Sequence, residues 1–394
     1  MTYERRVVIV GGGFGGVRAA LDLANKSEVS VRLVTPDKFF DYHSALYRSA
    51  TGRSPLEVAI PLADFFEFAT NVEVVRDRAA QLDDQQQQLH GESGAVYHYD
   101  ELILALGNTT DYYNIPGLKQ YSFSVKGIHD ALRLKRHLHQ RLIDGEVEHT
   151  YAIVGAGATG VELAAEMVPY LRRIRRKHGL SGDDFHVVLI EAGPQVLGAM
   201  LPEFAQRVQQ RLKKLGVTLL LSTAVEGETA EQLRLPEQII RSRTVIWTAG
   251  VTNSQFFTDN HQFELGKLNR VEVDEHLRAL DHVYVIGDSA ATRYTGMAQT
   301  ALHDAKFVAS DILHRQRGKQ PQPYEPERPI YAIPVGPRWA AVLWGKTTIY
   351  GFLGFILRRL ADLRLYLRFL PFLKALTTWQ YGFKDDEACE VCGQ

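Results

Sequence analysis

Cysteine is nearly absent from this sequence of 394 residues. The two cysteines, Cys389 and Cys392, both stand close to the C-terminal end. Because the body of the chain has none, no disulfide framework can hold the fold together, which is typical of proteins from reducing compartments. Two cysteines cannot complete a four-ligand zinc site within one chain, so we expect no metal site. A flexible tail, an intermolecular zinc site and a regulatory disulfide stay open as roles for this pair.

Long apolar runs are missing as well. Near the N-terminus the run Val7–Val10 ends at a glycine after four residues, whereas the apolar core of a signal peptide needs about 7–15 residues. In the C-terminal part the charge-free run Thr347–Leu357 has eleven residues, against about 20 for a transmembrane helix. The sequence therefore predicts neither an export signal nor a transmembrane helix, and we expect a cytoplasmic protein.

A strong charge of either sign is also missing. The formal net charge is −1, which gives no electrostatic reason to expect a nucleic-acid partner. Hydrophobic residues make up 45% and charged residues 23% of the chain, close to the average of globular proteins. At about 100–200 residues per domain, the length predicts two or three domains.

What the sequence does contain is a dinucleotide-binding pattern near its start. Four apolar β-branched residues form an expected strand, Val7–Val10, and Gly11, Gly13 and Gly16 then open an apolar-periodic helix, which a second strand follows. The first glycine allows the tight turn, the second lets a pyrophosphate approach the backbone, and the third lets helix and strand pack closely. The free N–H groups at the start of the helix bind the phosphates.

The same pattern occurs a second time. The expected strand 151–154 leads into Gly155, Gly157 and Gly160, and a helix and another strand follow. Two dinucleotide folds in series indicate two dinucleotides, which we interpret as a bound flavin, FAD, and a diffusible nicotinamide, NADH.

The two copies differ at the end of their second strand. In the second copy this strand ends in Glu191, whose carboxylate accepts hydrogen bonds from the ribose hydroxyls and repels a 2′-phosphate, so we expect a preference for NADH over NADPH. In the first copy the strand ends in Thr35, Pro36 and Asp37 without an acid at its tip. Either Thr35 or Asp37 therefore lies near the adenosine ribose of FAD.

Further segments close strands on small residues: YDELILALGN at 99–108, TVIWTAGV at 244–251 and HVYVIGDSA at 282–290. Together with GAGATGVELAAE, LIEAGP and GMAQTALHDAKFVASDI, they make the chain resemble the two-dinucleotide-binding-domain flavoproteins. Within that superfamily the chain resembles type II NADH dehydrogenases, the single-subunit NADH:quinone oxidoreductases. The resemblance extends over essentially the whole chain.

This resemblance implies roles for individual residues. Asp288 would bind the ribityl or pyrophosphate part of FAD, Ala298 and Gln299 would begin a helix whose N-terminus faces the flavin, and Glu162 would lie near the nicotinamide and flavin rings. His43 and Tyr47 lie where that family has a loop near the flavin, and they either take part in the site or only pack locally. The remaining positions expected at the cofactors are Phe14, Ala79, Gly107, Ala249, Gly250 and Gly287.

The sequence departs from the family at the quinone pocket. Family members carry a second glutamine after Ala-Gln-x-Ala, and here His303 takes its place, followed by Asp304. A histidine with an ordinary pKa of about 6.5 is suited to deliver the protons that a quinone needs with its electrons. The alternative is a surface or packing histidine in a pocket adapted to another acceptor.

The lack of cysteines narrows the chemistry that the resemblance allows. Disulfide reductases of this superfamily need a cysteine pair beside the flavin, and sulfide:quinone oxidoreductases need cysteines in mid-chain. The body of this chain has none, which excludes a covalent thiol relay. We therefore expect hydride to pass directly from NADH to the flavin.

The C-terminal stretch 351–379 has an apolar and a charged side. At helical spacing, one face carries the apolar residues and the opposite half the charged ones, and Pro371 ends the helix. The stretch has a charge of +4, from five basic residues and one aspartate, so we expect it to lie in the interface of an anionic membrane. A homodimer interface is the alternative, and both can hold together. The apolar residues are Ile356, Leu360, Leu363, Leu367 and Leu370, and the charged ones Arg358, Arg359, Asp362 and Arg368.

These observations predict an α/β fold with two Rossmann-like domains, one inserted in the other. The flavin domain would comprise residues 1–117 and 257–320, the NADH domain 118–256, and the docking segment 321–394. We expect a peripheral protein on the cytoplasmic side of the cell membrane, a homodimer, that passes electrons from NADH through FAD to a quinone near Gln299 and His303 without pumping protons. A soluble NADH reductase for a small redox protein and an NADH-responsive flavoprotein sensor are the alternatives.

Overall fold

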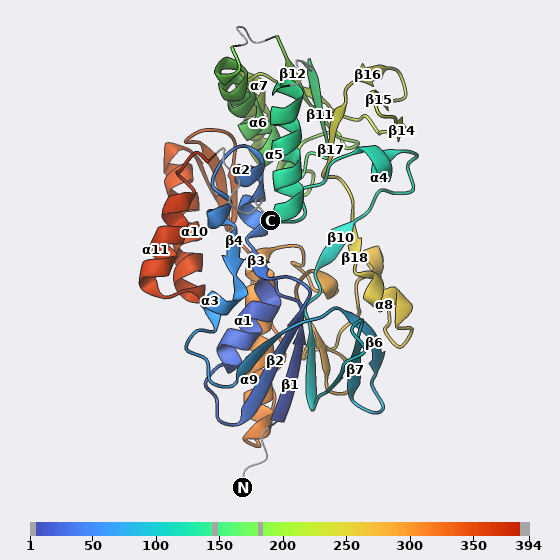
Figure 1. Ribbon diagram of the computed structural model, residues 1–394, viewed down its shortest axis with the longest axis vertical. Coiled ribbons are helices and arrows are strands. Elements are labelled where there is room, and N and C mark those ends of the chain that lie inside the picture. Colours follow the sequence, from blue (N-terminus) through green and yellow to red (C-terminus); the bar gives the residue numbers. More distant parts are fainter. Residues whose placement is uncertain (1–4, 144–148, 180–183, 387–394) are drawn as a thin grey trace.

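The computed structural model describes residues 5–143, 149–179 and 184–386. Two α/β halves lie one above the other in Figure 1, and the C-terminal helices cover one flank of the molecule. The α/β class and the C-terminal helices predicted from the sequence are confirmed. The cysteine pair lies outside the described residues.

The lower half in Figure 1 is built on a six-stranded sheet in the order β19-β20-β9-β1-β2-β5. All neighbouring strands are parallel except β19, which runs antiparallel to β20. Side chains alternate between the faces, so Val7 and Ile9 contact the helices α1 and α9, while Val8 and Val10 contact the small sheet β6-β7-β8. The strands of the large sheet are β1 (Arg5–Val10), β2 (Val29–Thr35), β5 (Val72–Arg76), β9 (Glu101–Leu104), β19 (Arg278–Leu280) and β20 (Val283–Val285). The covering elements are α1 (Phe14–Leu23), α9 (Ala298–Gln316), β6 (Ala79–Asp83), β7 (Gln88–Gly91) and β8 (Val96–His98).

The upper half repeats this plan with a parallel four-stranded sheet in the order β13-β12-β11-β17. Its helices bury the first face, and a small antiparallel sheet, β14-β15-β16, covers the second face over Ala152, Val154 and Trp247. The strands are β11 (Thr150–Val154), β12 (His186–Ile190), β13 (Val217–Leu220), β14 (Gly227–Glu228), β15 (Gln232–Arg234), β16 (Ile239–Arg241) and β17 (Thr244–Trp247). The helices are α5 (Ile128–Ile143), α6 (Ala158–Lys177) and α7 (Pro202–Leu215).

The chain passes between the halves at one place. Strand β10 (Asn108–Thr110) leads out of the first half and strand β18 (Val251–Asn253) leads back, and the two pair antiparallel. Figure 1 shows them side by side between the two halves. The upper half is therefore an insertion in the lower one.

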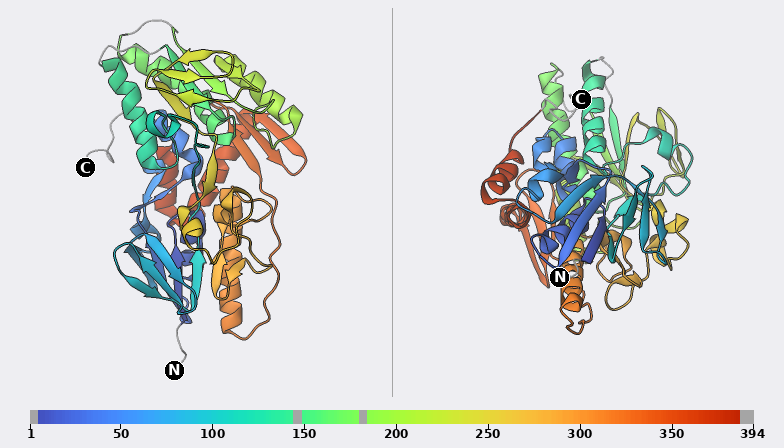
Figure 2. Two further views of the ribbon diagram at one scale, coloured as in Figure 1. Left: turned by 90° about the vertical axis from the view of Figure 1, so that its right-hand side faces the viewer. Right: turned by 60° about the horizontal axis from the view of Figure 1, so that its bottom comes forward.

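The C-terminal part adds a three-stranded antiparallel sheet and two helices. Helix α10 lies against this sheet, and a Cβ at Gly354 would come within 2.3 Å of the Ala340 carbonyl oxygen, so glycine permits the close approach. Figure 2 shows both helices, in red, at one edge of the molecule in the right-hand view. Among the described residues no helix is long and apolar enough to cross a membrane. The elements are β21 (Tyr331–Pro334), β22 (Ala340–Trp344), β23 (Thr347–Gly351), α10 (Phe352–Phe369) and α11 (Phe372–Tyr381). Short elements complete the fold: β3 (Phe39–Asp41), α2 (Leu46–Ala50), β4 (Ala59–Pro61), α3 (Leu62–Phe65), α4 (Leu118–Tyr121) and α8 (Gln255–Asp259).

Candidate functional site

The first glycine loop connects β1 with α1 and has the geometry of a phosphate cradle. A Cβ at Gly16 would lie 1.9 Å from the Gly11 carbonyl oxygen, so only glycine lets α1 pack this closely on the loop. Nothing lies within 4 Å of a Cβ at Gly13, so a ligand can approach the backbone there. Helix α1 begins at Phe14 without a side-chain cap, which leaves its first N–H groups for a phosphate. The loop therefore fits the pyrophosphate of FAD.

The remaining residues expected at FAD lie at the ends of neighbouring strands. Thr35 is buried at the end of β2, and its Oγ1 would be 2.9 Å from a Cβ at Gly12 in the glycine loop. Asp37 is exposed beyond it, and Ala79 is buried at the start of β6. Thr35 is thus the nearer of the two candidates for the ribose.

On the other side of β1, the ends of β9 and β20 bring the predicted flavin residues together. Asp288 accepts a hydrogen bond from the side chain of Asn108, the residue after Gly107. A Cβ at Gly287 would lie 3.2 Å from that of Ala301 in the first turn of α9, so this helix starts directly against the strand end. Helix α9 begins at Ala298 without a side-chain cap, so its dipole can act on a bound group.

The second glycine loop repeats the first. A Cβ at Gly160 would lie 1.9 Å from the Gly155 carbonyl oxygen, and nothing lies within 4 Å of one at Gly157. The carboxylate of Glu191 accepts hydrogen bonds from the backbone N–H of Ala156 at 2.7 Å and of Gly193 at 2.8 Å. These bonds hold the acid at the loop, which is the position predicted for the ribose of a nicotinamide nucleotide.

Ala249 and Gly250 close this site. A Cβ at Gly155 would come within 2.6 Å of the Ala249 Cα, so the two turns touch. A Cβ at Gly250 would lie 2.0 Å from the carbonyl oxygen of Asp111 in the crossover. The sequence brings these residues to the carboxyl ends of β11 and β17, as a nucleotide site at a parallel sheet requires.

Glu162 lies in the second turn of α6, the helix that opens at the second glycine loop. Its side chain is buried, and burial raises its pKa to about 8, while Arg358 and Arg48 oppose that shift. Tyr47 is buried beside Arg48 and accepts a hydrogen bond from its Nε at 3.0 Å. Glu162 thus retains its proton at neutral pH and lies close to charges from α10.

The side chains of Gln299 and His303 contact the linker that precedes β21. The side-chain amide of Gln299 donates to the Ile330 carbonyl at 2.7 Å and accepts from the Ile330 N–H at 3.1 Å. His303 Nε2 lies 2.8 Å from the carbonyl oxygen of Glu325. Both side chains fasten the linker before β21 to α9, and within the described part of the chain no hydrogen bond joins either of them to Glu162. Asp304 is buried and accepts from the Gly287 N–H at 2.9 Å, which supports the turn that follows β20.

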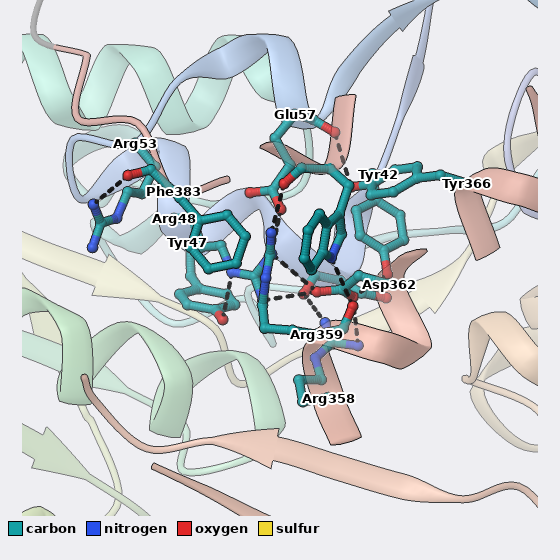
Figure 3. A network of polar contacts seen from close by, with 12 residues as sticks. Tyr42, Tyr47, Arg48, Arg53, Glu57, Arg358, Arg359, Asp362, Tyr366 and Phe383 are labelled. Carbon is teal, nitrogen blue, oxygen red and sulfur yellow. Dashed lines mark hydrogen bonds and ion pairs between the residues drawn. The ribbon is translucent and has the colours of Figure 1, made fainter. Parts of the chain in front are cut away.

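A buried charge cluster joins α10 to the segment 42–57. We use this name for Arg48, Glu57, Arg358, Arg359 and Asp362, which Figure 3 shows together with Tyr42 and Tyr366. Glu57 Oε1 accepts from Arg48 and from Arg359, both at 2.6 Å. Asp362 pairs with Arg48 and Arg358, each at 3.0 Å. Burial by itself would raise the pKa of Asp362, but Arg358, Arg48 and Arg359 hold it below its usual value.

This cluster corrects the sequence-based picture of α10. Arg358, Arg359 and Asp362 pack against the body of the protein beside Tyr366 and Phe369, whereas Arg368, which was expected on the same face, is exposed. Ile356 is 38%, Leu360 50% and Leu367 42% exposed, whereas Leu370 is buried. Helix periodicity predicts that two faces exist, but it contains no signal for Arg48 and Glu57, which come from a distant segment and provide charged partners inside.

The comparisons with known proteins agree with this arrangement. Residues 5–305 match the model of the family described as pyridine nucleotide-disulphide oxidoreductase. The type II NADH:quinone oxidoreductase Ndh of Mycobacterium tuberculosis is 30% identical over 96% of this chain and 88% of its own length. The type II NADH:quinone oxidoreductase of Staphylococcus haemolyticus is 24% identical over 82% of this chain and 85% of its own length. The solved structure of NDH2 from Plasmodium falciparum in complex with NADH superposes with a TM-score of 0.88 over 97% of this chain and 98% of that one, at 15% identity, which shows the common fold.

Proposed function

The chain belongs to the pyridine nucleotide-disulphide oxidoreductase family and, within it, to the type II NADH:quinone oxidoreductases, and from this premise we propose that it oxidises NADH with bound FAD and reduces a quinone at a membrane surface. One observation supports this most directly. Helix α6 begins at the predicted NADH loop and carries Glu162, which is buried close to Arg358 of α10 and Arg48 of α2. The other face of α10 is apolar and exposed. The electrostatic influence of Arg358 on Glu162 thus connects the proposed redox site with a surface suited to lipid.

The two glycine loops divide the binding of the cofactors. The loop with Gly11, Gly13 and Gly16 would hold FAD, with Thr35 on the ribose side and Asp288 on the ribityl side. The loop with Gly155, Gly157 and Gly160 would hold NADH, and Glu191 would select it over NADPH by charge. FAD, when bound, supplies the two-electron chemistry by accepting hydride from NADH and delivering electrons to the quinone.

The residues of the chain would supply protons and orientation. A quinone takes up two protons with its two electrons, and Glu162 holds one at neutral pH because burial raises its pKa to about 8. Arg358 and Arg48, which favour the ionised form, would stabilise the carboxylate after the proton has left. Gln299 and His303 stay a predicted second group of quinone residues. Their side chains would have to leave the linker to reach a substrate.

The exposed face of the C-terminal helices would place this site at the membrane. We define this docking face as Phe352, Leu353, Ile356, Leu360, Leu367, Phe372 and Leu373, which are between 38% and 75% exposed. Arg364 and Arg368 are exposed on α10, and among the residues that the structure describes neither forms an ion pair. An apolar face bordered by unneutralised arginines suits the cytoplasmic leaflet, which is anionic. A second copy of the chain covering the same face would form the homodimer.

The test of the proposed function is turnover with different acceptors. The purified protein, loaded with FAD, should oxidise NADH rapidly with a short-chain quinone and slowly with a small iron–sulfur protein. The variant Gly160→Val serves as a control for the second loop. Its bound FAD should no longer be reduced by NADH, because a Cβ at this position would meet the Gly155 carbonyl oxygen at 1.9 Å. Slow quinone reduction by a flavin that NADH reduces readily would instead favour the reductase for a protein acceptor or the sensor.

A further inference from the structure

Lys126 belongs to the flavin end of the molecule although it lies far from the glycine loop in sequence. It precedes α5, and its Nζ donates a hydrogen bond to the side-chain oxygen of Asn108 at 2.5 Å. The side-chain nitrogen of Asn108 donates in turn to Asp288. Three separate segments therefore meet where β9 and β20 end, the edge at which a parallel sheet binds its nucleotide.

The neighbours of this lysine are charged or titratable groups from the flavin side. Asp41, Asp288 and Lys126 all act electrostatically on the His43 ring, so these groups share one environment. The His43 ring also lies 6.4 Å from the ring of Phe14, in the glycine loop. Asp41 accepts a hydrogen bond from the N–H of Ile128 at 2.8 Å and so ties the start of α5 to the same place. The ammonium group thus lies near the entry of the predicted FAD cradle.

The ammonium group has donors to spare at this position. It is half-buried, and burial lowers its pKa while Asp288 opposes that shift. An ammonium carries three N–H donors, and among the described residues Asn108 is the one hydrogen-bond partner of this group. A tie between two loops would be made as well by a neutral donor, without the cost of removing a charge from water. A partly buried cation with free donors is instead suited to a ligand that carries negative charge.

We propose that Lys126 contacts the bound flavin, that Asn108 positions it there, and that its charge makes the flavin easier to reduce. The inference rests on the proposed function because it requires FAD in the first glycine loop. Reduced flavin carries more negative charge than oxidised flavin, and a nearby cation stabilises the more negative form. The chain already offers the dipole of α9 for this purpose, and Lys126 would add a full charge to it.

The experiment is the midpoint potential of the FAD-loaded protein, measured by absorbance during a reductive titration. Lys126→Met should lower the potential by about 30 mV or more, which corresponds to a tenfold change in the two-electron equilibrium. Lys126→Arg, which keeps the charge, should stay near the wild type. Lys119→Met removes an exposed lysine of α4 and should leave the potential unchanged.

A second variant keeps the proposal testable if Lys126→Met fails to retain FAD. Asn108→Ala leaves the lysine in place without its anchor, and it should lower the potential by a smaller amount. A bound flavin with the wild-type potential in Lys126→Met would show that the lysine only ties two loops together. If Lys126→Met cannot be loaded with FAD, a wild-type midpoint potential in Asn108→Ala would likewise show that the lysine only ties two loops together. Failure of the proposed function would look different, because the wild-type protein would then not bind FAD or its reduced flavin would not react with quinone.

Discussion

The two faces of α10 depart from the usual rule for a surface helix, because the buried face carries charged residues beside Tyr366 and Phe369. Its inner face carries Arg358, Arg359 and Asp362, which are 4–8% exposed or fully buried, and its outer face carries Leu353 and Leu360, which are 57% and 50% exposed. The inner face is stable because the body of the protein offers charged partners in Arg48 and Glu57. The difference teaches that an amphipathic pattern determines two faces, while the surroundings determine which of them is buried.

The inner face also has an uneven charge balance. The charge cluster contains three arginines, Arg48, Arg358 and Arg359, and two carboxylates, Glu57 and Asp362. Three positive and two negative charges leave one positive charge in excess. Glu162, which is close to Arg358 and Arg48, would balance this excess when it is ionised. The stability of the docked helix and the charge of the redox site are therefore coupled.

The largest effect is expected from breaking the inner face. Asp362→Ala removes the acid that pairs with Arg48 and Arg358; Arg48 keeps Glu57, but the buried Arg358 loses its carboxylate, and breaking a buried pair typically costs about 3–5 kcal/mol. The melting temperature of the FAD-loaded protein should fall by several degrees. Lys374→Ala, which breaks an exposed pair with Asp64 and Glu67, should change it little. Equal melting temperatures for Asp362→Ala and the wild type would show that the cluster does not hold α10.

Substitutions on the outer face should weaken membrane binding and leave the stability of the protein unchanged. In the double variant Phe372→Ser/Leu373→Ser the two most exposed residues of the docking face, at 64% and 75%, lose their apolar surface. Burying two such side chains in lipid is worth about 3 kcal/mol, so binding to anionic vesicles should fall at least tenfold at an unchanged melting temperature. Co-sedimentation with vesicles measures this. Ile239→Ser, at an equally exposed position on β16, is the matched control, and an equal loss there would point to unspecific adhesion.

The coupling between the inner face of α10 and Glu162 should appear as a pH dependence of stability. The pKa of Glu162 is about 8 in the folded protein and 4.5 for an ordinary glutamate. Between these values the unfolded chain has released a proton that the folded protein keeps, so the wild type loses stability as pH rises. The free energy of unfolding of Glu162→Gln should therefore rise relative to that of the wild type by roughly 3–4 kcal/mol from about pH 5 to about pH 8. Melting curves over this range test it, with Glu203→Gln on the surface as control; a constant difference would mean that Glu162 is ionised throughout.

The smallest effect is expected at the border of the two faces. Arg364→Gln and Arg368→Gln each remove an exposed charge from α10, and a basic residue near an anionic membrane is worth about 1 kcal/mol. Each variant should bind anionic vesicles about fivefold more weakly and neutral vesicles as well as the wild type does. Added salt should weaken vesicle binding by the wild type more than vesicle binding by a variant that carries both Arg364→Gln and Arg368→Gln. Identical binding to both kinds of vesicle would assign the docking to the apolar residues alone.

Local patterns were sufficient to predict the two strand–turn–helix loops, because a Cβ at Gly16 or at Gly160 would lie 1.9 Å from a carbonyl oxygen of its own loop. Glu191 could be placed as well, since it ends a strand beside that of the second loop. The contacts of Gln299 and His303 with the linker, and the tie between Lys126 and Asn108, could not be predicted. They depend on tertiary contacts between segments whose spacing in the sequence carries no periodic signal.

The central claim is that the docking face delivers the redox site to a quinone in lipid, and one measurement tests it most directly. NADH oxidation by the wild type and by Phe372→Ser/Leu373→Ser would be compared with a water-soluble short-chain quinone and with a long-chain quinone in anionic liposomes. We expect equal rates with the soluble quinone and at least a tenfold loss with the liposomal one. Equal liposomal rates for the two proteins, or an equal loss with both quinones, would contradict the claim.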